Sequence, residues 1–275
     1  MAAPDTATTT TGPSLAIPQA TTLLTTFTHF LTVSIHNILY YRGLYPSATF
    51  LTSRAYNLPV HQSRHPAVCS WVRDAVDAAR AQLVLGSVER LALVIYDAAG
   101  AVMERWMFDV ARFPVWNGVP LSNQSEVDIQ EKEGAAEDEE DIAAAADIDA
   151  ELLGGGDQQQ SDINWTNVDE QLRAAVRRLA YVGEKMGPLP EGCTFSVAVE
   201  LRDEAEAPIG HPQPWVPTKP SLQPTSRDQR TPGEDVGGAT TTAVRAIEAG
   251  PLFFECWVEE SKAKLGLSSA VSSNG

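Results

Sequence analysis

Most of the negative charge of this chain lies in one stretch, residues 117–164. Fourteen Asp and Glu residues occur there against one base, Lys132, which accounts for −13 of the formal net charge of −16 and leaves −3 for the rest. The stretch also contains the run Glu137–Asp141, an alanine tract and three consecutive glycines. Such a composition buries too little apolar surface to offset the entropy lost on ordering. We therefore expect a disordered acidic insertion, and a solvated loop is a commoner role for such a block than an interaction tail.

A second stretch, residues 203–250, also lacks regular patterning. It contains seven prolines, several glycines and a threonine cluster, yet it keeps one isolated tryptophan, Trp215. Proline has no backbone N–H to donate, so this composition predicts an irregular segment. An isolated Trp in a loop either pins the loop to the domain or contacts a partner, because indole rings are frequent hot spots at interfaces.

Three helices are predicted from apolar residues at helical spacing. The first spans about residues 21–41. The second begins at Pro66, because proline suits the first turn of a helix. The third spans about residues 168–186 and is expected to be capped by Thr166 or Asn167.

Four strands are predicted around these helices. Residues 88–96 form a nearly continuous apolar run, which is typical of a strand covered on both faces. Residues 102–110 follow after a short turn and predict its antiparallel partner. Residues 193–201 alternate between apolar and polar side chains, and residues 252–258 complete the pattern. Helices flanking a mostly antiparallel sheet define an α+β domain, with residues 42–65 expected to be an irregular arm.

No catalytic or cofactor motif is found. The sequence lacks the phosphate-binding loop, the nucleophile elbow, the H-E-x-x-H zinc motif and the dinucleotide fingerprint. His61 and His65 lie four residues apart, but they precede a helix and lack the Cys, His or carboxylate partners of a metal site. The three cysteines show no C-x-x-C spacing, which argues against a structural zinc or a disulfide framework. We expect no catalytic residue, no cofactor and no metal.

Charge and hydropathy exclude further classes. An acidic total argues against binding of nucleic-acid phosphates or anionic membranes as the main activity. Residues 1–20 lack the basic and apolar regions of a secretory signal, and residues 23–41 are too polar for a transmembrane helix. We expect an intracellular and soluble protein. Three tryptophans are candidates for contact with a partner, although core packing is the commoner role of an aromatic residue: Trp71, Trp215 and Trp257.

Several motifs, in order along the chain, resemble the HORMA-domain family, and within it the accessory subunits of translesion DNA polymerase zeta. Each motif alone would be weak, but together they are specific, and the similarity covers roughly residues 20–116 and 165–265. The motifs are Tyr45-Pro46, Tyr56-x-x-Pro59-Val60, His65-Pro66, Pro190-x-Gly192-Cys193-Thr194-Phe195 and Val258-Glu259-Glu260.

The resemblance implies a HORMA fold, in which three helices pack on a mostly antiparallel sheet and a mobile C-terminal "safety belt" wraps around a partner peptide. It places a single domain at residues 20–265, interrupted by the insertion at 117–164, with the belt at 203–260. Residues 1–19 and 266–275 are expected to be disordered. The partner peptide would pair with an edge of the sheet, a recognised mode of peptide binding.

The resemblance also implies the site residues. Trp71 and Trp215 match positions that contact the partner peptide, and Glu255 and Trp257 match the surface that binds the scaffold polymerase. Arg173 lies near a family dimer contact.

The implied function is a non-catalytic adaptor in the nucleus. The partners would be a peptide of the catalytic subunit of polymerase zeta and the scaffold deoxycytidyl-transferase polymerase, with a HORMA dimer and an AAA+ remodeller as further partners. No direct nucleic-acid or membrane contact is expected. Three alternatives stay open: a HORMA adaptor of the spindle checkpoint, meiotic axis or autophagy, an enzyme with an unrecognised site, and a direct DNA binder.

Overall fold

The fold is that of a computed structural model. Four of the segments named above lie largely outside the residues that it describes: residues 1–14, residues 265–275, most of the acidic insertion and most of the predicted belt. The residues described are 15–114, 116, 118–120, 163–202, 205, 208, 215–216 and 240–264.

The three predicted helices are confirmed, and two of them begin earlier than expected. Helix α1 spans Ile17–Tyr41, α2 spans Pro66–Val84 and α4 spans Trp165–Lys185. A proline in the first turn of α1 allows the earlier start, because its missing N–H needs no helical partner there. The cap predicted for α4 was wrong: the side chain of Asn164 accepts a hydrogen bond from the backbone N–H of Asn167 at 3.0 Å.

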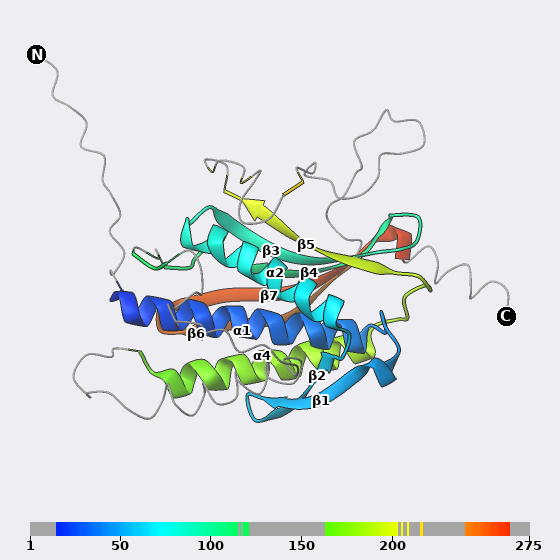
Figure 1. Ribbon diagram of the computed structural model, residues 1–275, viewed down its shortest axis with the longest axis horizontal. Coiled ribbons are helices and arrows are strands. Elements are labelled where there is room, and N and C mark those ends of the chain that lie inside the picture. Colours follow the sequence, from blue (N-terminus) through cyan, green and yellow to red (C-terminus); the bar gives the residue numbers. More distant parts are fainter. Residues whose placement is uncertain are drawn as a thin grey trace, which may run out of the picture.

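Five strands form one antiparallel sheet in the order β5-β3-β4-β7-β6. All four pairings are antiparallel, so the predicted α+β class is confirmed. The last strand of the chain, β7, lies inside the sheet between β4 and β6 (Figure 1). The strands are β3 (Val88–Tyr96), β4 (Val102–Asp109), β5 (Thr194–Leu201), β6 (Thr240–Ala249) and β7 (Leu252–Glu260).

Two regions that were expected to be irregular contain strands. Between α1 and α2, after the short 3-10 helix η1 (Ser47–Thr49), the chain forms a hairpin of β1 (Phe50–Ala55) and β2 (Leu58–Ser63). Its two-residue turn places Tyr56 and Asn57 at φ values of 50° and 56°, as hairpin turns of this length often require. The turn was missed because Tyr-Asn lacks the glycine that usually marks it. The second such region is the Pro-rich stretch 203–250, the end of which forms strand β6.

The acidic insertion is shorter than the expected 117–164. Val119 and Ile163 are both buried, so both ends of the predicted stretch belong to the folded domain. Arg80 of α2, itself buried, donates from Nη1 to the carbonyl of Pro120 at 2.8 Å. The part of the insertion outside the described residues is therefore 121–162.

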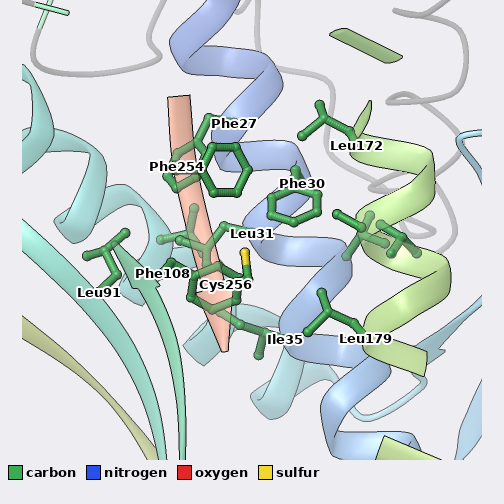
Figure 2. Close-up of a cluster of buried hydrophobic side chains, with 14 of the residues drawn as sticks. Phe27, Phe30, Leu31, Ile35, Leu91, Phe108, Leu172, Leu179, Phe254 and Cys256 are labelled. Atoms are coloured by element: carbon green, nitrogen blue, oxygen red, sulfur yellow. The ribbon is translucent and has the colours of Figure 1, made fainter. Parts of the chain in front are cut away.

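The main core lies between the sheet and the helices. Helix α1 is central to it, because it contacts α2, α4 and β2. Figure 2 shows Phe27, Phe30 and Phe254 meeting where α1 lies over β7, with Leu172 and Leu179 facing them from α4. The ring of Phe254 packs edge-on against that of Phe27, with 5.1 Å between centroids.

We expect Phe254→Ala to lower the free energy of unfolding by about 3–5 kcal/mol, because it leaves a cavity at a fully buried position. Urea denaturation measures the change. The control is Phe253→Ala, since Phe253 is half-buried and faces away, with the Arg112 guanidinium over its ring at 3.7 Å. Equal losses in the two variants would contradict the placement of the core.

His29 of α1 gives the fold a pH dependence. Burial lowers its pKa from 6.5 to about 4, and its Nδ1 lies 3.2 Å from the hydroxyl of Tyr56 at the hairpin turn. The unfolded chain takes up this proton below pH 6.5, whereas the folded chain resists it until about pH 4. The stabilisation is therefore complete above pH 6.5 and is lost as the pH falls towards 4.

We expect wild type to lose about 2–3 kcal/mol of unfolding free energy relative to His29→Gln between pH 7 and pH 4.5. Urea denaturation at both pH values gives the difference. The exposed His65 supplies the control, because His65→Gln should follow wild type at both values. A constant gap between wild type and His29→Gln would show that His29 titrates normally in the fold.

Candidate functional site

Strand β5 has a free outer edge. It pairs with β3 on one side, and no other strand of the described chain lies on its other side. Its side chains are mostly half-buried. The outer edge of such a strand presents backbone N–H and C=O groups that can pair with a further extended chain. The edge can therefore accept one more strand.

Aromatic side chains from two other segments surround the start of this edge. Trp71 of α2 is 39% exposed, and its ring meets that of Phe195 on β5 in a T-shaped contact with centroids 4.9 Å apart. Tyr45 makes a second T-shaped contact with Phe195 at 6.4 Å. An exposed tryptophan on a well-packed aromatic base is suited to hold an apolar side chain of a peptide. The motif with Phe195 was quoted from the sequence, but its contact with Trp71 joins residues 124 positions apart and no local pattern indicates it.

The connection from β5 to β6 begins and ends at opposite edges of the sheet. Strand β5 ends at Leu201, opposite Val88 at one edge, whereas β6 begins at Thr240, opposite Glu260 at the other edge and the other end. The 38 connecting residues, 202–239, could extend to about 125 Å. Four strand spacings of about 4.8 Å separate the two edges. The connection is therefore several times longer than the crossing needs.

Trp215 is the one predicted site residue of this connection that the structure describes. Its side chain is half-buried, and its Nε1 is buried without a hydrogen-bond partner in the described chain. The next residue, Val216, is 83% exposed. A buried indole N–H without an acceptor costs free energy that a partner carbonyl could recover. The structure does not join Trp215 to Trp71.

Glu255 and Trp257 lie on the same face of β7, as the two-residue period of a strand requires. This face is opposite to the one that the helices cover. Glu255 is exposed, while Trp257 packs against a small second cluster that includes Met107 and donates from Nε1 to Glu259 at 2.8 Å. The indole N–H is thus already bonded within the strand, so the exposed carboxylate and the ring surface are what a partner can contact.

Ion pairs across neighbouring strands order this second face of the sheet. Arg90 of β3 pairs with Asp109 on β4 at 3.1 Å and with Glu200 on β5 at 3.0 Å. Arg105 of β4 pairs with Glu259 on β7. These pairs link four adjacent strands, from the free edge to the strand that carries Trp257.

A buried ionic cluster closes one end of the sheet. The carboxylate of Glu104 on β4 is fully buried and accepts from Arg42, after α1, and from Lys264, after β7, at 2.7 and 2.6 Å. Trp106 adds an indole donor at 3.1 Å. Arg42 also donates to the carbonyl of Gly183 near the end of α4. The cluster joins helices, sheet and C-terminal segment, and its members lie too far apart in sequence to be predicted.

Arg173, the predicted dimer contact, lies on α4, which packs against α1 and β6. Its side chain is 40% exposed and pairs with Glu170 of the same helix. The same side of the helix carries an exposed Tyr181. The helix surface is thus accessible and bears a polar and an aromatic group.

Two kinds of feature were sought in the described part of the chain: clusters of metal-binding side chains and helices that could span a membrane. It contains no group of three or more His, Cys, Asp or Glu residues that could hold a metal ion. His61 stacks on the ring of Tyr40 at 3.5 Å rather than facing His65. None of the described helices combines the length and hydropathy of a membrane span.

A three-helix α+β domain with a free strand edge and a long crossing segment defines a class of peptide-capturing modules. The HORMA domain, as a protein family, matches residues 24–237. The chain belongs to the HORMA-domain family.

Among its relatives is the DNA polymerase zeta processivity subunit of Schizosaccharomyces pombe, which is 29% identical over 85% of this chain and 91% of that protein. The mitotic spindle assembly checkpoint protein MAD2B of Homo sapiens is 26% identical over 64% of each chain. A solved mitotic checkpoint complex contains a similar chain, with TM-score 0.55, 19% identity, and coverage of 87% of this chain and 98% of that one. C. elegans HTP-2 bound to an HTP-3 closure motif gives a TM-score of 0.51 at 14% identity, covering 86% and 85%.

We expect Lys264→Met to lower the free energy of unfolding by about 2–3 kcal/mol, the low end for breaking a buried pair, because Glu104 keeps Arg42 as a partner. Urea denaturation measures the loss in the free energy of unfolding. Hydrogen exchange should show that the amides of β6 and β7 lose protection before those of α1. The exposed Lys262 provides the control variant Lys262→Met. Equal stability of the two methionine variants would show that the Glu104 cluster does not stabilise the β6–β7 hairpin.

Proposed function

We propose that this protein is a non-catalytic adaptor subunit of a translesion DNA polymerase zeta. It captures an extended peptide of the catalytic subunit on the outer edge of β5 and encloses it with the segment between β5 and β6. The observation that carries the proposal is the free β5 edge beside Trp71, joined by 38 residues to a hairpin at the opposite edge.

The geometry supports enclosure rather than simple docking. The segment 202–239 is anchored at Leu201 on one edge and at β6 on the other, so its two ends remain fixed when a peptide lies between them. Release then requires local unfolding of the segment or of the hairpin that anchors it. Dissociation can be slow without a large interface, because its rate follows the opening of the belt.

The choice of polymerase zeta rests on the relatives. The fission-yeast protein that carries the name of its processivity subunit shares 29% identity over most of both chains. An adaptor of the spindle checkpoint or the meiotic axis is the second candidate, favoured by the match to a chain of a mitotic checkpoint complex. The pairing of HTP-2 with a closure motif supports peptide capture for the fold in either case.

The second face of the sheet would bind the scaffold polymerase. Glu255 and the ring of Trp257 are accessible there, on the side of β7 away from the helices. Peptide capture at β5 and scaffold binding at β7 use different strands, so both can occur at once. The protein would then act as a bridge in the nucleus, with Arg173 of α4 as the contact of a HORMA dimer and an AAA+ protein to reopen the belt.

We expect Trp71→Ala and Trp215→Ala each to weaken capture of a catalytic-subunit peptide by about 2 kcal/mol or more, as truncated hot spots do. Isothermal calorimetry with the purified protein measures the affinity. Tyr181→Ala is the matched control, because this exposed aromatic residue lies on α4 and should leave the affinity unchanged. Unchanged affinity in both tryptophan variants would place the peptide elsewhere.

Affinity purification from cells under DNA damage tests the function itself. The expected result is recovery of the polymerase zeta catalytic subunit and the scaffold polymerase. A double variant, Glu255→Ala with Trp257→Ala, should lose the scaffold polymerase and retain the catalytic subunit. Recovery of checkpoint proteins without any polymerase would overturn the proposal in favour of the second candidate.

A further inference from the structure

Positive charge is in excess on the side of the domain formed by α4 and the β1–β2 hairpin region. No Asp or Glu occurs between Leu15 and Arg73, a range that includes α1 and the β1–β2 hairpin. The hairpin region adds the exposed Arg54 and Arg64. In Figure 1, α4 and this hairpin lie together on the side of α1 away from β5. The near-neutral total of the folded part therefore conceals a basic side.

The outer surface of α4 carries a cationic patch around one tyrosine. Arg177, Arg178 and Lys185 are exposed, and Tyr181 is 52% exposed between them. The Arg178 guanidinium carbon lies 5.3 Å from the centre of the tyrosine ring, and Lys185 Nζ lies 5.9 Å from it. The spacings of three and four residues put these groups on one side of the helix.

These three cations have no acidic partner in the described chain, although Glu184 lies beside Lys185 in sequence. Arg173 is paired with Glu170, one turn earlier, so the unpaired charge begins where that pair ends. Unpaired arginines around an exposed aromatic ring are typical of interface surfaces, in which Arg and Tyr are enriched. The chemistry fits an acidic polypeptide, whose carboxylates pair with guanidinium groups in bidentate geometry.

We propose that this patch, defined as Arg177, Arg178, Tyr181 and Lys185, binds the chain's own acidic segment, residues 121–162. That segment holds all fourteen acidic residues of the insertion and Lys132, a formal charge of −13. The densest part of it is the run Glu137–Asp141. The proposal does not depend on the polymerase role.

The covalent connection places the segment within reach of the patch. The segment rejoins the fold at the buried Ile163, two residues before α4 begins at Trp165. Sixteen helical residues separate Trp165 from Tyr181, a rise of about 24 Å. Asp141 precedes Trp165 by 24 residues, which could extend to about 79 Å, so the acidic run can reach Tyr181.

The covalent link to α4 favours one acidic partner, the chain's own segment, over the others that could bind the patch. A binding site within reach of such a link meets the tethered segment at an effective concentration in the millimolar range. A second copy of the chain or a nucleic acid offers negative charge only at its bulk concentration. The tethered segment is therefore favoured over both at the micromolar concentrations of most proteins. The bound acidic segment shields this patch of α4 from other polyanions.

Zero-length carbodiimide crosslinking of the full-length protein tests the proposal, because it joins carboxylates to lysine amines that they touch. Lys185 is the sole lysine of α4. Mass spectrometry should find Lys185 joined to Glu137–Asp141 in 20 mM salt, with a yield that falls several-fold in 500 mM salt. An equal mixture of ¹⁴N and ¹⁵N protein should give crosslinked pairs of one isotope only. The acetylation of Lys185 by an amine-reactive ester verifies that the amine is accessible.

Matched double variants identify the patch. Arg177→Ser with Arg178→Ser should reduce the crosslink at least three-fold, whereas Arg54→Ser with Arg64→Ser, which removes the same charge from the hairpin region, should leave it unchanged. Absence of the crosslink from an accessible Lys185, or its loss in both double variants, would overturn the proposal. Mixed-isotope pairs would show that the patch binds the acidic segment of a second copy. Loss of the crosslink on addition of an equimolar DNA duplex would show that it binds nucleic acid. Either result would contradict the proposal.

Discussion

The buried carboxylate of Glu104 is the interaction on which the assembled fold depends. It belongs to β4, the middle strand of the sheet, and accepts hydrogen bonds from Arg42, which follows α1 in the chain, and from Lys264, which follows β7. A carboxylate with no exposed surface would be too costly alone, so the buried strand position needs cationic partners, and Arg42 and Lys264 supply them. The cluster thereby connects the first helix, the centre of the sheet and the C-terminal segment, three parts whose residues are separated by as many as 222 positions (42 to 264).

The same arrangement gives the two edges of the sheet different roles. One edge ends in the β6–β7 hairpin, which the Glu104 cluster holds through Lys264. The other edge, β5, has no neighbour strand in the described chain, and Trp71 of α2 packs there against Phe195 of β5. Under the proposed function, the segment between the two edges is anchored at both ends while it surrounds a peptide. The stability of the Glu104 cluster would then govern how long that peptide stays bound.

Local patterns in the sequence predicted most of the fold. The apolar run at residues 88–96 and the helical spacing in α1, α2 and α4 are strong signals, because burial requires them. The β1–β2 hairpin was missed because its turn uses Tyr56 and Asn57, and β6 was missed because Thr-rich residues follow a Pro-rich region. For the proposed site, Trp71 and Trp257 were predicted from the family resemblance, and their binding roles stay predictions. The contact of Trp71 with Phe195 and the Glu104 cluster depend on residues distant in sequence, which no single-sequence pattern relates.

The position of β7 has a consequence for synthesis of the chain. This strand is the last element of the sheet to leave the ribosome, yet it lies between β4 and β6 and carries Phe254 into the centre of the core. Until residues 252–264 have emerged, β4 has an open edge and Glu104 lacks its lysine. The core therefore cannot be completed element by element, and the sheet closes in a late step that needs residues far apart in sequence. Until that step, β4 and β5 both present open edges to an extended chain.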